Sequence, residues 1–380
     1  MLIFEGGNTT VTSNITGKSY SGEKIDLNAV KLPVFRKEFM KLFNTLNDLF
    51  YKEYKRKLWK SEDITNAIIF NGSSSYALSS EYPESEILKH KSQIGDIDVT
   101  IPDYELKPMF LLLRKNENKR FGKFTYKGSY QQNENAIGDQ IITIFKFYYD
   151  NENYVNTQID FEGVDFANGS PTEFARFGHS SSFEDAKENI KALHHKCLIQ
   201  SIFTTLSIRP DIVIATNSST PDNIKQASWN KVKPAKGYKF STTGGLRFCL
   251  TPMLDKNGNI CKYNGRDVYK EIPTKESKFI RNVSEIFKMA FGGKGNIADF
   301  HSFIGICKLI KKHCDIETQK NILENYFVSM FGPSAQQKEK DIDADIALKL
   351  PAVNYIENAL KLRVQRKEGR IQAYKARRSQ

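Results

Sequence analysis

One short segment limits the fold of this chain more than any other, because two aspartates alternate there with β-branched residues. In residues 94–101, Asp96 and Asp98 alternate with Ile97 and Val99. Successive side chains of a strand point to opposite faces of a sheet. The segment therefore predicts a strand with one face in the core and two carboxylates on the other. Carboxylate oxygens are the ligands that Mg²⁺ (or Mn²⁺) prefers, so we predict that Asp96 and Asp98 bind a metal.

A possible phosphate-binding turn precedes this segment. Residues 67–70 are apolar and predict a buried strand, which ends at Asn71-Gly72-Ser73, and a polar helix is predicted from Ser73 onward. A Gly-Ser turn at a helix start brings backbone N–H groups and a hydroxyl close to a phosphate. We therefore predict that Gly72 and Ser73 bind a nucleotide beside the two aspartates.

A third carboxylate is expected from a neighbouring strand. Residues 155–161 have a strand pattern that ends close to Asp160. We predict that Asp160 lies beside the aspartate pair and acts as a metal ligand or as a base toward the attacking hydroxyl. Glu162 and Asp165 are alternatives for this role, and a strand-end acid exposed to solvent also fits the pattern.

The Asp-x-Asp pattern alone is weak, because about one such pair is expected by chance in a chain of this length. A second instance lies at residues 341–345, in a charged segment of predicted helix with no Gly-Ser strand before it. We interpret that instance as a solvated helix face. The flanking residues, and not the two aspartates alone, distinguish the pair at Asp96 and Asp98.

Together, Gly72-Ser73, Asp96-Ile97-Asp98 and Asp160 resemble the motifs of the polymerase-β-like nucleotidyltransferase superfamily. The resemblance covers roughly residues 60–165. It implies a mixed sheet with helices, dependence on Mg²⁺ (or Mn²⁺) and a nucleoside triphosphate (NTP) substrate. Two features depart from the pattern. An insertion at residues 81–86 lengthens the spacer between Ser73 and Asp96, and Asn71 replaces the apolar residue before the glycine.

The same resemblance implies a basic contact to the triphosphate. Superfamily members often place such a residue on the helix that follows the catalytic sheet. Here Lys196 or Lys191, in a helix predicted over residues 182–207, is the candidate, and plain solvent exposure is the alternative. His194 and His195 are adjacent on that helix and face different directions, so they are poor joint metal ligands.

The pattern along the chain predicts an α+β fold. We expect an N-terminal arm and helix in residues 1–60, a mixed-sheet nucleotidyltransferase core in residues 61–170, and a mostly helical C-terminal domain with a basic tail in residues 171–380. The first of these segments has apolar residues at three- and four-residue steps from 27 to 59. In the last segment we predict a hairpin over residues 239–250 and further helices over residues 274–289, 297–313 and 316–331.

The basic charge of the chain is uneven. The net charge is +12, and residues 361–380 hold eight basic residues against one acid. A basic segment suits a phosphate backbone, so we expect this tail to bind the acceptor of the reaction and not the NTP. A solvated C-terminal helix is the alternative interpretation.

Composition limits the cellular setting and the partners. The five cysteines include no Cys-x-x-Cys pair, which favours a reducing compartment and gives no support for zinc. No run approaches the roughly 18 apolar residues of a membrane span, and the N-terminus lacks a signal-peptide pattern. We therefore predict a cytoplasmic protein of a bacterial or phage-infected host cell, with no membrane partner. The oligomeric state does not follow from the sequence.

These observations predict a metal-dependent enzyme that transfers a nucleoside monophosphate (NMP) from an NTP to a hydroxyl acceptor. An RNA 3′ end is the favoured acceptor because of the positive charge, and a protein hydroxyl and a small molecule are the other candidates. The alternative function is a non-catalytic, basic nucleic-acid-binding or virion-associated protein on a decayed nucleotidyltransferase fold. Metal-dependent binding of NTP separates the two.

Overall fold

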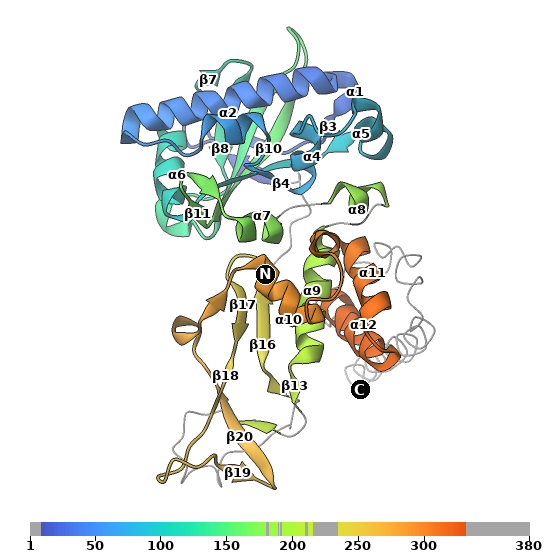
Figure 1. The fold of residues 1–380 in the computed structure, drawn as a ribbon. Helices are drawn as coiled ribbons and strands as arrows, with labels where there is room; N and C mark the ends of the chain where they lie inside the picture. The colour runs from blue at the N-terminus through green and yellow to red at the C-terminus, as the bar shows by residue number, and fades with distance from the viewer. Residues whose placement is uncertain are drawn as a thin grey trace, which may run out of the picture. The chain divides into compact units, whose positions relative to one another are not determined.

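The structure is a computed structural model that describes residues 9–179, 182–188, 190, 192–209, 212–215 and 235–331. The chain splits into two compact units, residues 1–192 and residues 193–380. Each combines helices with strands, which confirms the predicted α+β class (Figure 1). The three-part division expected from the sequence stays a prediction.

The first unit is built on a six-stranded sheet with the strand order β4-β6-β10-β9-β8-β7. The pair β6–β10 is parallel and the other neighbouring pairs are antiparallel, so the sheet is mixed as predicted. The strand bounds are β4 (Phe70–Asn71), β6 (Asp96–Pro102), β7 (Arg120–Phe121), β8 (Phe124–Ser129), β9 (Gln140–Tyr148) and β10 (Tyr154–Val164).

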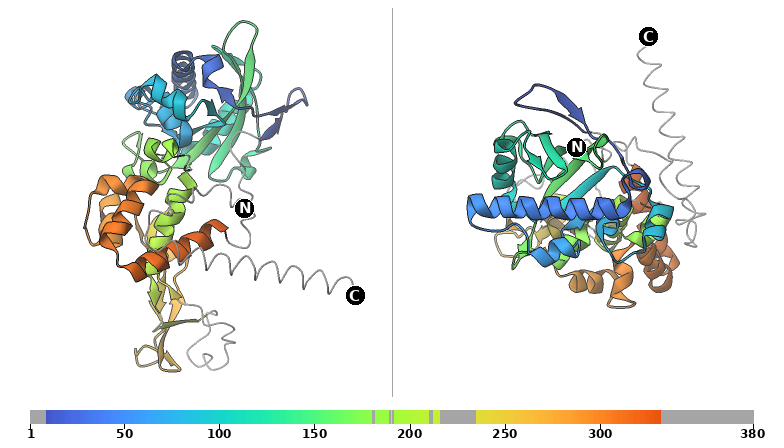
Figure 2. Two further views of the ribbon diagram at one scale, coloured as in Figure 1. Left: turned by 90° about the vertical axis from the view of Figure 1, so that its right-hand side faces the viewer. Right: turned by 90° about the horizontal axis from the view of Figure 1, so that it is seen from above.

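A long helix, α2 (Leu32–Tyr54), lies across one face of this sheet (Figures 1 and 2). Its Phe39 ring lies edge-on to the rings of Phe124 and Phe147, with centroids 4.8 and 5.3 Å apart. Phe43 makes the same kind of contact with Phe161. All of these rings are buried, so the aromatic stripe of the helix fixes which face of the sheet belongs to the core.

The remaining elements of the first unit are short. The helix α5 (Glu84–His90) lies within the long spacer between Ser73 and Asp96, and its buried Ile87 anchors it in the core. The short elements are β1 (Thr10–Thr12), β2 (Ser19–Ser21), β3 (Ile25–Asp26), α1 (Leu27–Val30), α3 (Ser61–Thr65), α4 (Gly72–Leu78), α5 (Glu84–His90), β5 (Gln93–Ile94), α6 (Leu106–Lys115), β11 (Phe166–Ala167), β12 (Ser170–Pro171), α7 (Glu173–His179) and α8 (Phe183–Lys187).

The second unit combines helices with small sheets. Its helices are α9 (Ala192–Leu206), which begins at the last residue of the first unit, α10 (Val283–Phe291), α11 (Phe303–His313) and α12 (Ile316–Phe331). Its strands are β13 (Ile208–Arg209), β14 (Ile212–Ala215), β15 (Ala235–Lys236), β16 (Tyr238–Ser241), β17 (Gly245–Phe248), β18 (Leu250–Pro252), β19 (Lys262–Tyr263), β20 (Arg266–Glu271) and β21 (Phe279–Ile280).

Within this unit, several sequence predictions can be checked. The predicted hairpin over residues 239–250 is confirmed as β16–β17. The adjacent histidines are core residues: His194 Nδ1 lies 2.6 Å from the Tyr326 hydroxyl, and His195 Nε2 lies 2.9 Å from the Phe300 carbonyl. Burial lowers the pKa of His195 to about 4. One ring nitrogen of each histidine is therefore engaged by a contact in the core of this unit.

Two predicted helices are interrupted. The helix expected over residues 182–207 is two helices, because α8 ends after Lys187 and α9 begins at Ala192. The Ile190 N–H bonds back to the Asp185 carbonyl and closes α8. The helix expected over residues 274–289 starts only at Val283, where the Asn282 side chain caps it, because Phe279–Ile280 pair with β17 instead. Helical periodicity does not reveal either break.

Candidate metal and nucleotide site

The register of one parallel strand pair brings the predicted carboxylates together. Asp98 of β6 is the direct partner of Asp160 of β10, and Asp96 is the partner of Gln158. Val99 and Phe161, the next residues, are the next partners in the register, and the Phe161 ring contacts α2. Because side chains alternate along a strand, Asp98 and Asp160 point to the other face of the sheet.

The three carboxylates form one cluster. One oxygen each from Asp96, Asp98 and Asp160 all lie within 4.8 Å of one another. This confirms the predicted convergence. The cluster offers only oxygen ligands, which fits Mg²⁺ or Mn²⁺, and in sites with two such ions the metals are roughly 4 Å apart. The alternatives considered from the sequence, Glu162 and Asp165, are not members of this cluster.

Gly72 is adapted to the carboxylate of Asp98. Asn71 pairs with Asp98 across β4–β6, and the chain then turns into α4 at Gly72 with φ +53°. A Cβ atom at this position would lie 2.2 Å from Asp98 Oδ2. The backbone angle favours glycine, and a side chain at this position would displace the Asp98 carboxylate. Its predicted contact with a nucleotide stays a prediction, and what the structure shows is its close approach to a carboxylate.

Ser73 lies in the first turn of α4 and is partly exposed. The following serines fix this turn, because Ser74 Oγ donates to the Asn71 carbonyl (2.6 Å) and Ser75 Oγ donates to the Gly72 carbonyl (2.8 Å). Within the described residues, the hydroxyl of Ser73 forms no hydrogen bond of this kind. Its predicted contact with a nucleotide stays a prediction.

Gln158 is a site residue that the sequence analysis missed. Its amide Nε2 donates to both oxygens of Asp160, at 3.1 and 2.9 Å, while its Oε1 accepts from the backbone N–H of Thr9 (3.2 Å). The Gln158 side chain is buried, so these contacts fix the orientation of the Asp160 carboxylate. The available signal was its position two residues before Asp160, which places it on the same face of β10.

A fourth carboxylate is held next to the cluster by two further side chains that were missed. Asn71 Nδ2 donates to Glu162 Oε2 (2.6 Å), and His179 Nδ1 lies 3.2 Å from the same oxygen. His179 is the last residue of α7 and is almost fully buried. Asn71, the departure from the superfamily pattern, therefore has a local reason, because it binds Glu162 on the same face as the aspartates.

Burial and mutual repulsion raise the pKa of two members of the cluster. The pKa of Asp160 is well above its usual range because the carboxyl is buried and the charge of Asp96 is close, and the hydrogen bond from Gln158 opposes this shift. Burial and the charge of Glu162 raise the pKa of Asp96, which Lys91 partly offsets. A cation bound by the cluster would stabilise the ionised form of both groups.

The remaining predicted site residues lie elsewhere in the chain. Lys196 is on α9 in the second unit and is partly exposed, so its contact with a triphosphate stays a prediction. Lys191, residues 341–345 and the basic tail lie outside the residues that the structure describes.

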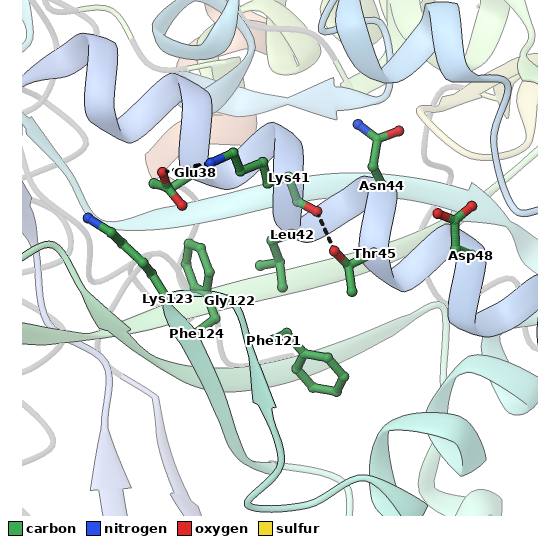
Figure 3. Close-up of a pocket in the computed structure, with 10 residues that line it drawn as sticks. All are labelled: Glu38, Lys41, Leu42, Asn44, Thr45, Asp48, Phe121, Gly122, Lys123 and Phe124. Atoms are coloured by element: carbon green, nitrogen blue, oxygen red, sulfur yellow. Dashed lines mark hydrogen bonds and ion pairs between the residues drawn. The ribbon is translucent and has the colours of Figure 1, made fainter.

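A separate depression lies on the other side of the sheet, between α2 and the β7–β8 hairpin (Figure 3). It has a volume of about 550 Å³ and is open to solvent. Its lining holds two acidic residues, Glu38 and Asp48, and two basic residues, Lys41 and Lys123, and Lys41 pairs with Glu38 at 3.3 Å. Nothing in this lining matches the acidic cluster, so the depression is not the predicted site.

Comparison with known proteins gives no relative. No family model, curated protein or solved structure matches this chain. In the described ranges, no helix has both the length and the apolar character needed to cross a membrane.

The geometry at Gly72 predicts the effect of adding one methyl group. Gly72→Ala should displace the Asp98 carboxylate and weaken Mn²⁺ binding by roughly tenfold or more, as expected when a metal site loses its support. Gly122→Ala is the matched control, since Gly122 also has a positive φ (60°) but has no atom within 4 Å of an added Cβ. Calorimetric titration with Mn²⁺ measures the difference. Equal affinities in the two variants would show that the contact with Asp98 has no role in metal binding.

The raised pKa of Asp160 predicts how stability depends on pH. When folding raises the pKa of a carboxyl group, the folded protein becomes less stable as the pH rises through that pKa. Without metal, Asp160→Asn should therefore be more stable than the wild type at pH 7, by roughly 2–4 °C in Tm for each kcal/mol of repulsion removed. The difference should vanish near pH 4, where the wild-type carboxyl is protonated.

Excess Mn²⁺ should reverse the ranking at pH 7, because only the wild type keeps the complete cluster. Thermal denaturation with EDTA and with Mn²⁺ tests both statements. A variant that melts below the wild type in EDTA at pH 7 would instead show that the hydrogen bonds from Gln158 outweigh the repulsion.

Proposed function

We propose that this chain is a metal-dependent nucleotidyltransferase, which transfers NMP from an NTP to a hydroxyl acceptor and releases pyrophosphate. One observation carries the proposal. Two neighbouring parallel strands place Asp96, Asp98 and Asp160 on one face, and the turn at Gly72 closes against Asp98. Three clustered carboxylates repel one another and are partly desolvated, an arrangement that cations stabilise.

The donor set fits a divalent metal, and Asp96, Asp98 and Asp160 would hold it. When bound, Mg²⁺ supplies positive charge that stabilises the attacking and leaving oxygens of phosphoryl transfer. Mn²⁺ prefers the same oxygen ligands and would occupy the same site.

Asp160 is the candidate base. Its raised pKa makes the ionised carboxylate a stronger acceptor of a proton, and Gln158 holds the group in one orientation. In the proposed step, the acceptor oxygen attacks the α-phosphorus of the NTP while its proton moves to Asp160. The bond from the α-phosphorus to the bridging oxygen breaks, and pyrophosphate leaves with that pair of electrons.

The turn between β4 and α4 would bind the triphosphate. Gly72 allows the backbone to pass close to Asp98, and the Ser73 hydroxyl would donate a hydrogen bond to a phosphate oxygen. Lys196 remains the candidate for a further phosphate contact. The Asn71–Glu162–His179 contacts hold the start of this turn against β10 and α7, so they would position the turn without touching the nucleotide.

Substitution of the aspartate pair tests the proposal. Asp96→Asn and Asp98→Asn should each lower NMP transfer by at least roughly a hundredfold, since each removes a ligand for the charge that stabilises the transition state. Asp343→Asn is the matched control, because it alters the second Asp-x-Asp pattern, which we interpret as a solvated face.

The measurement is transfer from each labelled NTP, with Mg²⁺ or Mn²⁺, to a pool of RNA and to a pool of protein. Binding of the same NTPs, with and without metal, is measured in parallel. Transfer that persists in both variants would assign the chemistry to other residues. Absence of metal-dependent NTP binding would favour the non-catalytic nucleic-acid-binding alternative.

A further inference from the structure

The positive charge of the chain belongs to the second unit. Residues 1–192 hold 24 basic and 27 acidic residues, a formal charge of −3, whereas residues 193–380 hold 32 basic and 17 acidic residues, a charge of +15. The C-terminal tail accounts for only part of this excess. Residues 235–281 alone hold ten basic and four acidic residues, and we refer to them as the basic sheet region.

Eight of the ten cations of this region are exposed at its surface. Three of the exposed ones are Lys270, Lys275 and Lys278, which form no ion pair with any residue that the structure describes. Two of the four acids of this region form ion pairs within it, because Glu271 pairs with Lys239 and Asp267 pairs with Lys262. The full set of exposed cations is Lys239, Lys256, Lys262, Arg266, Lys270, Lys275, Lys278 and Arg281.

Aromatic rings are interleaved with these cations. In the sheet β16-β17-β21, Arg247 is the direct partner of both Lys239 and Phe279, so the three side chains form one row across a face. Phe279 is 36% exposed. On the opposite face, Phe248 is 46% exposed and its ring lies 5.2 Å from that of Tyr238. Both faces therefore present an aromatic ring to solvent.

The central residue of the row is held in place. Arg247 Nη1 donates to Ser277 Oγ (3.0 Å), and its Nη2 lies 3.8 Å from Glu271 Oε1. Three hydroxyl side chains follow at this end of the hairpin, from Ser241 at the end of β16 and from Thr242 and Thr243 in the turn. A fixed cation, free lysines, exposed rings and hydroxyls thus occur within one short region.

We propose that the basic sheet region binds single-stranded RNA, and that this RNA is the acceptor of the reaction. Unpaired lysines match the phosphate backbone, and exposed rings match the faces of unpaired bases, which a duplex conceals. The hydroxyls of the turn suit the 2′-OH groups that distinguish RNA from DNA. Naming the RNA as acceptor rests on the proposed function, whereas RNA binding itself does not require the carboxylates.

Fluorescence anisotropy with the full-length protein and a labelled single-stranded RNA of mixed sequence tests the proposal, in EDTA and without NTP. The combined variant Lys270→Gln, Lys275→Gln, Lys278→Gln should bind roughly tenfold more weakly. The slope of log K against log salt should become smaller by about two, since each single-strand phosphate contact contributes about 0.7. Phe279→Ala should weaken binding roughly fivefold or more and leave the salt slope unchanged, because a stacking contact carries no charge.

The control neutralises three exposed lysines of the first unit, Lys37→Gln, Lys52→Gln and Lys57→Gln, and should bind RNA like the wild type. Circular dichroism shows whether each variant is folded. Asp96→Asn should also bind RNA normally, so loss of transfer in that variant concerns only the proposed chemistry.

Three outcomes would overturn the inference. If the lysine variant and Phe279→Ala bind like the wild type, while deletion of residues 361–380 abolishes binding, the tail is the RNA-binding element. If DNA of the same sequence or an RNA duplex binds as tightly, the surface is not specific for single-stranded RNA. If RNA does not bind but an acidic peptide does, the partner is a protein.

Discussion

The parallel pairing of β6 with β10 is the constraint on which the candidate site depends. Because Asp98 lies opposite Asp160 in this register, two carboxylates from distant parts of the chain face the same side of the sheet. A slip of one residue would turn either carboxylate toward the phenylalanines of α2 and expose an apolar side chain in its place. Val99 and Phe161, buried on the α2 side, therefore hold the acidic cluster in register.

This register concentrates negative charge, and neighbouring side chains bind two of the carboxylates. Gln158 supplies hydrogen bonds to both oxygens of Asp160, and Asn71 with His179 binds the carboxylate of Glu162. These contacts orient the acids, but they do not neutralise the cluster, because the pKa values of Asp96 and Asp160 remain raised. The structure thus aligns carboxylate oxygens that could hold a metal ion.

Much of the site could be predicted from the sequence, because strand alternation is a local property. The spacing of Asp96 and Asp98 determines their common face, and the strand that ends near Asp160 was recognisable from its own pattern. Gly72 was predicted for its approach to phosphate, whereas the structure shows an approach to Asp98 that depends on the pairing of β4 with β6. Gln158 and His179 were missed because their partners are defined only by the folded sheet and by α7.

For the fold, too, features with a local sequence pattern were predicted and features that depend on tertiary pairing were not. The long helix α2 and the two strands that carry Asp96, Asp98 and Asp160 have strong periodic patterns and were predicted. The end of α8 depends on a backbone hydrogen bond from Ile190, and the late start of α10 depends on the Asn282 cap and on pairing with β17, which periodicity does not record. The same holds for the basic regions, since the charge excess of the tail is evident in the sequence, while the row of Lys239, Arg247 and Phe279 is defined only by the pairing of the strands.

The central claim is that Asp96, Asp98 and Asp160 hold divalent metal against a triphosphate. A crystal structure with Mn²⁺ and a non-hydrolysable NTP analogue tests it most directly, through the anomalous signal of the metal. The account predicts a peak in contact with all three carboxylates, with metal–oxygen distances of about 2.1–2.2 Å, close to those of Mg²⁺, and with phosphate oxygens as further ligands. Analogue bound away from these residues, or Mn²⁺ found only at other acidic groups, would contradict it.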